Sequence, residues 1–187
     1  MPAITFLSEQ FLIAMPGLQD GYFDRSVSLV CQHDEQGAMA LMLNRDSEFN
    51  LGALFTQMNL PCDSPELCAH NVLSGGPVRP ERGFVLHEGF GSWDSSLKLA
   101  CGLTVSTSRD ILEAIAAGTG PQRFQVILGY SGWSANQLEA ELADNAWLHA
   151  PLSHEIIFDM PTEQRWQAAA KQLGIDLSLI SSQTGHA

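Results

Sequence analysis

The stretch LGYSGWSANQLEAELADNAWL, residues 128–148, combines the end of an apolar run, a pair of glycines, a helix start and two tryptophans. Ser134 precedes Gln137 by three residues, which is the spacing of a capping box. In such a box the serine hydroxyl accepts from the Gln137 N–H, and the glutamine side chain reaches back to the cap. Trp133 and Leu138 stand at the two positions of a hydrophobic staple. The pattern predicts a helix that begins directly after Ser134, with Trp133 held against the core.

Two glycines stand just before this predicted helix. Gly129 and Gly132 enclose Tyr130 and Ser131, directly after the apolar run at residues 124–128. Glycine permits backbone conformations that other residues avoid, and a helix N-terminus offers unpaired N–H groups. The junction is either a cradle for an anion or polar ligand, or a well-capped strand-to-helix turn that binds nothing. The sequence leaves both interpretations open.

Composition limits the class of protein. The chain has 187 residues, of which 45% are hydrophobic and 16% charged. This length and composition predict one domain over residues 1–187, with a core large enough to need no disulfide or metal. No apolar run is long enough to span a bilayer, and the N-terminus does not resemble a signal peptide, so we expect a soluble, cytoplasmic protein without a membrane partner. The net charge of −12 opposes the binding of phosphate backbones, so no general nucleic-acid binding is expected.

The order of periodic segments favours an α+β fold. Strand-like runs at residues 26–31 and 38–43 predict a hairpin whose second strand is central, because that strand is apolar on both faces. Short apolar runs predict further strands at residues 11–14, 71–73, 83–87 and 97–105. Helical spacing, caps and turn residues predict other elements. These are a helix at 51–58 capped by Asn50, a surface loop at 61–70, a helix opened by residues 107–110, a buried strand at 124–128, a strand at 156–158, and a helix after Pro161 with Trp166, Ala170 and Leu173 inward. Hairpins at the start of the chain argue against a doubly wound parallel sheet.

Cysteine and histidine occur close together at two places in the chain. Cys31 and His33 share a strand face, which permits a thiolate–imidazolium pair, but the sequence places no third group beside them and leaves the reactivity of Cys31 open. Cys62, Cys68 and His70 lack the paired spacing of a zinc site. The sequence therefore predicts reduced thiols, no metal site and no cofactor.

A second candidate for ligand binding is SGGPVRPERG at residues 74–83. Gly75 and Gly76 can present consecutive backbone N–H groups, and Arg79 and Arg82 add positive charge for a carboxylate or phosphate. The alternative is a tight hairpin with solvated arginines. His87, at the end of the following strand, is either a general base or a hydrogen-bonded structural residue.

We expect these segments to meet in one cleft that binds an anion. An acidic protein must concentrate its positive potential somewhere, and glycine N–H groups, a helix start and Arg82 all favour negative charge. His87, Tyr130 and Ser134 then supply polar contacts, and Trp133 supplies an apolar wall. We also expect Trp133, Trp147 and Trp166 to lie in or against the core.

Six segments of the chain resemble the motifs of a known family. They are FLIAMPGLQDGYFDRSV, GAMALMLNR, SGGPVRPERGFVLH, STSRDILEAIAAG, LGYSGWSANQLEAELADNAWL and the terminal GHA, in order from residue 11 to residue 187. The chain is similar to the YqgE/AlgH family of bacterial proteins. The resemblance implies one α+β domain with a mixed, largely antiparallel, branched sheet that forms a pseudo-barrel with about four flanking helices. The family has no established reaction, and part of it is labelled as transcriptional regulators through a link to alginate production.

The functional expectation is a cytoplasmic ligand- or partner-binding protein with an indirect regulatory role. A small anionic ligand or a protein partner fits the polar turns and the lack of a complete catalytic set. The alternative is an enzyme of unknown reaction that uses a polar cleft with Arg82, His87 and residues 129–134. The excess of acidic over basic residues and the lack of a basic recognition helix both argue against direct DNA binding.

Overall fold

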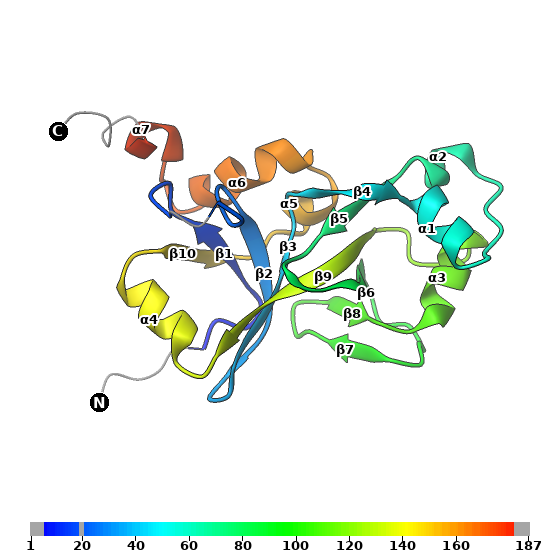
Figure 1. The fold of residues 1–187 in the computed structure, drawn as a ribbon, viewed down its shortest axis with the longest axis horizontal. Helices are drawn as coiled ribbons and strands as arrows, with labels where there is room; N and C mark the ends of the chain where they lie inside the picture. The colour runs from blue at the N-terminus through cyan, green and yellow to red at the C-terminus, as the bar shows by residue number, and fades with distance from the viewer. Residues whose placement is uncertain (1–5, 19–20, 182–187) are drawn as a thin grey trace. The chain divides into compact units, whose positions relative to one another are not determined.

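The computed structural model describes residues 6–18 and 21–181 of the chain (Figure 1). Contacts divide it into two compact units. The terminal unit comprises Met1–Arg45 and Tyr130–Ala187, and the middle unit comprises Asp46–Gly129. Strand β9 (Phe124–Ser134) runs from the middle unit into the terminal unit. The terminal GHA motif lies outside the described residues.

The terminal unit is built on an antiparallel sheet in the order β10-β1-β2-β3-β9. Its other strands are β1 (Gln10–Ala14), β2 (Val27–Asp34), β3 (Gly37–Met42) and β10 (Trp147–Pro151). The predicted hairpin of β2 and β3 is confirmed, and β3 lies between β2 and β9. At Gly37, which has φ of +137°, a Cβ atom would lie 2.1 Å from the Trp133 carbonyl oxygen. This position therefore requires glycine, because any side chain would collide with the neighbouring strand.

Helices cover both faces of this sheet. Leu12 and Ala14 share a core cluster with Leu138 of α4 (Gln137–Ala143), and strand alternation turns the equally buried Phe11 and Ile13 to the opposite face. Helix α6 (Thr162–Lys171) packs on β1, β2 and β10, and Figure 1 shows it across these strands from α4. The shorter helices α5 (His154–Phe158) and α7 (Leu177–Ser181) complete the unit.

The helix predicted to begin at residue 135 begins instead at Gln137, because β9 continues through Ser134. Half of the capping box forms: the Ser134 N–H donates to Gln137 Oε1 at 3.0 Å, but the serine hydroxyl bonds to the same oxygen and not to a helix N–H. Ser134 pairs with Gly37 in the sheet, so strand pairing competes with capping, and Asn136 makes the turn with φ of +64°. Residues 129–134 are therefore a strand segment, and the predicted glycine turn is wrong.

Two further expectations for the terminal unit need correction. Residues 156–158 lie in helix α5 and not in a strand, because Ser153 accepts from the Ile156 N–H and caps a helix there. Leu173 lies beyond the end of α6 and is exposed, whereas Trp166 and Ala170 are buried as expected. Trp133 and Trp147 are also buried, which confirms the expectation for all three tryptophans.

The middle unit combines short strands with three helices. Its strands are β4 (Asp46–Asn50), β5 (Asn71–Ser74), β6 (Val78–Glu88), β7 (Ser96–Lys98), β8 (Leu103–Ser106) and the first half of β9. Strand β6 lies between β9 and β8, β7 pairs with β8, and β5 runs parallel to β9. Because β5 and β6 both neighbour β9, the segment at 74–83 is not the tight hairpin that the sequence suggested.

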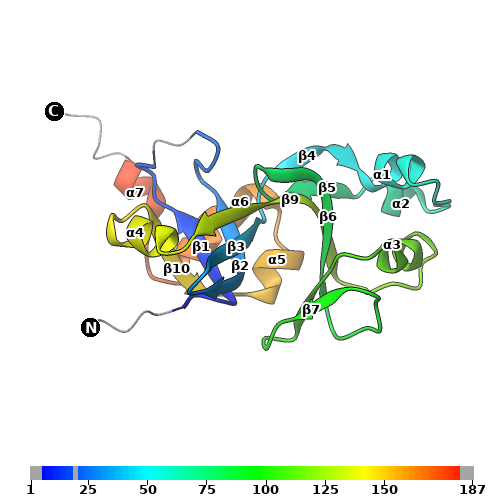
Figure 2. The same ribbon diagram turned by 60° about the horizontal axis from the view of Figure 1, so that its bottom comes forward.

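The helices of the middle unit are α1 (Leu51–Gln57), α2 (Pro65–Cys68) and α3 (Arg109–Ala116). The Asn50 side chain caps α1 as predicted, accepting from the Ala53 N–H at 2.8 Å. Helix α2 stands in the segment 61–70, where the sequence indicated only a loop. Figures 1 and 2 show α1, α2 and α3 on one side of β6, and residues of α1 and α3 share a core cluster with Val85 and Val126.

The fold class is α+β, with a mainly antiparallel arrangement of strands, as the sequence predicted. Among residues 6–18 and 21–181, four helices have seven or more residues, namely α1, α3, α4 and α6. Within the same residues, no helix combines the length and the apolar character needed to cross a bilayer.

Candidate functional site

The middle unit contains a pocket of about 410 Å³ formed by β6, β9, the end of α1 and the start of α3. This volume falls within the range of small-molecule sites, roughly 300–1,000 Å³. The lining residues are Leu54, Gln57, Met58, Glu81, Gly83, Phe84, Val85, Ser106, Thr107, Ser108, Arg109, Leu112, Val126 and Leu128. Seven of these fourteen residues have apolar side chains, and four of the six polar ones, residues 106–109, gather where β8 passes into α3. The other two are Gln57 at the end of α1 and the acidic Glu81 on β6.

The start of α3 forms the polar side of the pocket. Asp110 organises it: one carboxylate oxygen accepts from the Ser108 hydroxyl and from the Ile111 N–H, and the other accepts from the Asp94 N–H at 2.9 Å. The Ser108 hydrogen bond holds the pKa of Asp110 below its usual value, so this carboxylate is charged at neutral pH. Ser108 therefore stands at the N-cap of α3 but binds Asp110 and not a helix N–H.

Arg109 is the positively charged residue of the lining. Its Nε donates to Glu113 Oε1 at 2.9 Å, and its Nη2 donates to the Met58 carbonyl at 2.7 Å. The second bond ties the start of α3 to the end of α1, which are the two helical walls of the pocket. Because the side chains of Arg109 and Glu113 are about half exposed, the ion pair contributes little stability, and its main effect is to orient the guanidinium.

A buried hydrogen-bond chain reaches the pocket from β6. His87 is 0% exposed, its Nδ1 lies 3.2 Å from the Glu88 carbonyl, and its Nε2 lies 2.8 Å from Ser106 Oγ. A carbonyl only accepts, so Nδ1 carries the proton and Nε2 accepts from the Ser106 hydroxyl. Ser106 Oγ is in turn 2.8 Å from Ser96 Oγ. Burial lowers the pKa of His87 from 6.5, so the imidazole is neutral at pH 7.

Three of the predicted glycines, Gly75, Gly76 and Gly129, lie in the middle unit, and Gly75 and Gly129 serve close packing. A Cβ atom on Gly75 would lie 2.4 Å from the Gly129 carbonyl oxygen, and a Cβ atom on Gly129 would lie 2.6 Å from the Gly76 carbonyl oxygen. The Gly75 N–H donates to the Leu128 carbonyl at 2.8 Å. These glycines therefore let the segment after β5 lie directly on β9, and the Gly75 N–H is already engaged there.

The predicted arginines lie on the surface of the middle unit. Arg82 stacks on Phe84, with its guanidinium carbon 5.3 Å from the ring centroid, and Arg79 adopts φ of +45°. Neither forms an ion pair with any residue in the part of the chain that the structure describes. Arg82 does not line the pocket, but the ring on which it stacks, Phe84, does.

The remaining predicted residues belong to the terminal unit. Trp133 is a core residue that contacts Trp147 edge to face, Tyr130 is half-buried, and Ser134 is exposed at the end of β9. None of the eight predicted ligand-binding residues lines the 410 Å³ pocket, although His87 reaches it through Ser106. The sequence did contain a signal for the pocket, since three hydroxyls and an arginine follow one another in STSR at residues 106–109.

The Cys31–His33 pair that the sequence permitted, but did not predict, does not form, because both His33 ring nitrogens have other partners. His33 Nδ1 accepts from the Leu7 N–H at 2.9 Å, so Nε2 carries the proton and donates to Glu139 Oε1 at 2.9 Å. Both ring nitrogens of His33 are therefore engaged in holding the N-terminal segment and α4 on β2. Within residues 6–18 and 21–181, no three His, Cys, Asp or Glu side chains are grouped closely enough to hold a metal ion.

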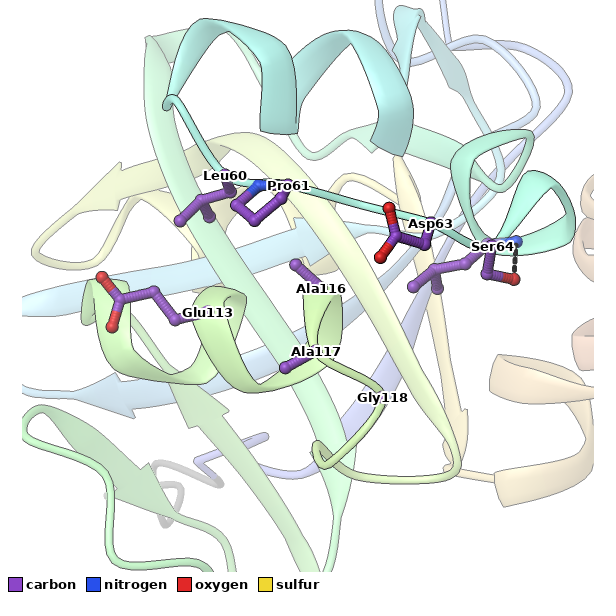
Figure 3. A pocket seen from close by; sticks show the side chains of 9 residues that line it. Leu60, Pro61, Asp63, Ser64, Glu113, Ala116, Ala117 and Gly118 are labelled. Carbon is purple, nitrogen blue, oxygen red and sulfur yellow. Dashed lines mark hydrogen bonds between the residues drawn. The ribbon is translucent and has the colours of Figure 1, made fainter.

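A larger pocket, of about 630 Å³, lies between the segment 60–67 and the second half of α3 (Figure 3). Figure 3 shows the carboxylates of Asp63 and Glu113 on its two sides. Ser64 lines it too, but its hydroxyl accepts from the Leu67 N–H at 3.3 Å and caps α2. The charged groups of this pocket are acidic, so its chemistry differs from that of the smaller pocket.

Comparisons with other sequences extend over nearly the whole chain. A family model described as AlgH-like matches residues 11–178. A UPF0301 protein of Stenotrophomonas maltophilia (strain K279a) is 50% identical over 182 residues, which cover 97% of this chain and 97% of that protein. A UPF0301 protein of Xanthomonas campestris pv. campestris (strain B100) is 51% identical over 183 residues, which cover 98% and 97% respectively.

Solved structures similar to this one include a close relative and a more distant one. The solution structure of the AlgH protein from Pseudomonas aeruginosa matches with a TM-score of 0.81 and 47% identity, covering 100% of this chain and 99% of that chain. The crystal structure of a protein from Corynebacterium diphtheriae matches with a TM-score of 0.73 and 20% identity, covering 94% and 91%. Because the second structure is only 20% identical, it shows a similar fold and nothing about function.

Proposed function

The chain belongs to the AlgH-like family. From this premise we propose that it is a cytoplasmic protein with an indirect regulatory role. In this proposal the protein binds a small molecule in the 410 Å³ pocket. One observation carries the proposal: three segments with family motifs meet at this pocket. SGGPVRPERGFVLH contributes Gly83 and Phe84, STSRDILEAIAAG contributes residues 106–109, and LGYSGW contributes Leu128. Segments that lie far apart in the chain are thus joined at one concave surface.

The lining indicates the chemistry of the ligand. An apolar wall that includes Phe84, Leu112 and Val126 favours a hydrophobic body of the ligand. The guanidinium of Arg109 favours a carboxylate, phosphate or carbonyl at its polar end. The Ser106 and Ser108 hydroxyls give their protons to His87 and Asp110, so toward a ligand they can only accept. The exposed Arg82 guanidinium stacks on the lining residue Phe84 and adds positive charge beside the pocket, whereas the lining residue Glu81 adds a negative charge. A net charge of −12 opposes DNA binding. We therefore propose that the protein regulates through the ligand that it binds or through a protein partner, and not by binding DNA itself.

Filling the pocket at Gly83 tests this proposal. A Cβ atom at Gly83 would meet only Leu128 Cδ2, at 3.9 Å, so Gly83→Val adds bulk at the wall without a backbone clash. We expect the variant to keep the melting temperature of the native protein but to lose thermal stabilisation by a panel of carboxylate- and phosphate-bearing metabolites. Differential scanning fluorimetry measures both quantities, and native mass spectrometry identifies a co-purified ligand.

Gly17→Val is the matched control, since Gly17 lies in the terminal unit and lines none of the pockets described above. A Cβ atom added there would meet nothing within 4 Å beyond its chain neighbours. This control should retain any stabilisation by ligand. If Gly83→Val binds the stabilising metabolite as tightly as the native protein does, the ligand binds elsewhere and the proposal is wrong.

The His87–Ser106 pair favours a second candidate function, an acyl-transfer or hydrolytic enzyme. His87 is neutral, its tautomer is set by the Glu88 carbonyl, and its Nε2 accepts from a hydroxyl that lines the pocket. This is the arrangement that activates a serine nucleophile. Ser106 Oγ would attack the substrate carbonyl while its proton passes to His87 Nε2, and the same proton would then go to the leaving group.

A fluorophosphonate probe tests this candidate, because the serine oxygen attacks phosphorus, fluoride leaves and His87 takes the proton. We expect labelling at Ser106, its loss in Ser106→Ala, and its retention in the control Ser134→Ala, because Ser134 is exposed in the terminal unit and does not line the pocket. Because burial lowers the pKa of His87 from 6.5, labelling should be at its maximum at neutral pH and fall as the pH decreases through this lowered pKa. Peptide mass spectrometry that finds no label on Ser106 at a pH of about 7.5, where the imidazole is neutral, would exclude the enzyme candidate and leave the binding proposal intact.

A further inference from the structure

We infer that Cys62 and Cys68 form a reversible intramolecular disulfide, which locks the wall of the 630 Å³ pocket under oxidising conditions. The two Sγ atoms are 2.8 Å apart, and both residues are half-buried, so small oxidants can reach them. The disulfide bond length is about 2.05 Å, so bond formation needs only a small further movement of the two side chains. Cys31 offers no such chemistry, since it is buried and its thiol contacts the Leu29 carbonyl.

Local structure holds the two thiols together. Cys62 stands two residues before Ser64, which caps α2, and Cys68 is the last residue of that helix. The Cys68 N–H donates to the Ser64 carbonyl at 3.0 Å, so a single helical turn brings the chain back beside Cys62. Gly52 of α1 packs directly on Cys68, because a Cβ atom on Gly52 would lie 3.0 Å from Cys68 Cβ. The pair is therefore fixed against α1.

The hydrogen bond between the thiols assigns their roles. Cys68 donates to Cys62 Sγ, and this bond is the largest cause that raises the pKa of Cys68. Because this hydrogen bond holds the Cys68 proton against Cys62 Sγ, we assign the first attack to Cys62. The Cys62 thiolate attacks one sulfur of a low-molecular-weight disulfide, forming a mixed disulfide and releasing one thiol. Cys68 then loses its proton, attacks Cys62 Sγ and releases the second thiol. Two electrons and two protons pass from the protein to the oxidant.

The disulfide affects the 630 Å³ pocket because the segment 61–68, which contains both cysteines, forms one wall of that pocket. Asp63, Ser64 and Leu67 lie between the two cysteines in sequence and line the pocket, and Pro61 adjoins Cys62. Figure 3 shows this segment facing the Glu113 and Ala116 side chains of α3. A bond between residues 62 and 68 closes a short loop and removes conformational freedom from the wall. Oxidation should thus make the segment 61–68 more rigid while leaving α3 unchanged.

Redox titration of the full chain tests this inference. In buffers of reduced and oxidised glutathione, we expect the number of alkylatable thiols to fall from the four present to two, with one peptide pair joined through Cys62 and Cys68. The variant C31S/C101S should still form this bond. C62S and C68S should each form no internal disulfide, and C68S should accumulate glutathione on Cys62, the first sulfur to react.

Amide hydrogen exchange gives the second measurement. Exchange at Leu67 and Cys68 should slow on oxidation of C31S/C101S and stay constant in C62S under the same buffer. The inference is overturned if C31S/C101S keeps both thiols reduced across the titration or yields only glutathione adducts. A disulfide that forms without any change in exchange at residues 61–68 would refute its effect on the pocket. Either of these two outcomes would leave the proposal of ligand binding in the 410 Å³ pocket unaffected.

Discussion

Replacing Trp133 by alanine is expected to lower the free energy of unfolding by about 3 kcal/mol or more. The indole is 7% exposed and sits in the core cluster of the terminal unit. It contacts Trp147 edge to face at 5.9 Å and stacks with Phe23 at 6.4 Å between ring centroids. Truncation removes this buried aromatic surface and leaves a cavity that the β-sheet cannot close. Urea unfolding followed by circular dichroism measures the loss.

Phe90→Ala is the control for that experiment, because Phe90 is 62% exposed. Its truncation removes an aromatic ring without opening a core cavity, so we expect a change below about 1 kcal/mol. A midpoint of unfolding for Trp133→Ala equal to that of the native protein would mean that this cluster does not stabilise the terminal unit.

Replacing Glu141 by leucine is expected to cost about 2–4 kcal/mol, because the carboxylate satisfies two indole donors at once. One oxygen, Glu141 Oε2, accepts from Trp133 Nε1 at 2.9 Å and from Trp147 Nε1 at 2.7 Å. The other oxygen accepts from the Gln137 side chain at 3.1 Å. Leucine leaves both indole N–H groups in the core without an acceptor, and each unsatisfied donor costs about 1–3 kcal/mol.

Two variants separate this effect from loss of charge. Glu141→Gln keeps one acceptor oxygen and should lose less than half of what Glu141→Leu loses. Glu163→Leu removes a carboxylate from the first turn of α6 and should change stability by about 1 kcal/mol or less. Thermal unfolding monitored by tryptophan fluorescence compares all three. Equal losses in Glu141→Leu and Glu163→Leu would show that the indole bonds do not contribute.

Several elements follow from residues that are neighbours in the sequence. Asn50 and the apolar spacing after it determine α1, because the cap and the first helical N–H groups are three residues apart. The β2–β3 hairpin follows from alternation on both sides of a short polar turn. The family motifs likewise lie in the sequence, and the three buried tryptophans were predicted from apolar stripes and staple positions.

The candidate site depends on contacts between distant residues, which local patterns do not contain. Gly129 suggested a turn, yet β9 continues through it, because pairing with β3 extends the strand and close packing on the Gly76 carbonyl requires glycine. His87 and Ser106 are 19 residues apart, and the β6–β8 register brings them together. The pocket, like this pair, exists only where β6, β9, α1 and α3 meet. Local propensity thus determined the elements, whereas strand register and side-chain packing, which act between distant residues, decided which polar groups share a site.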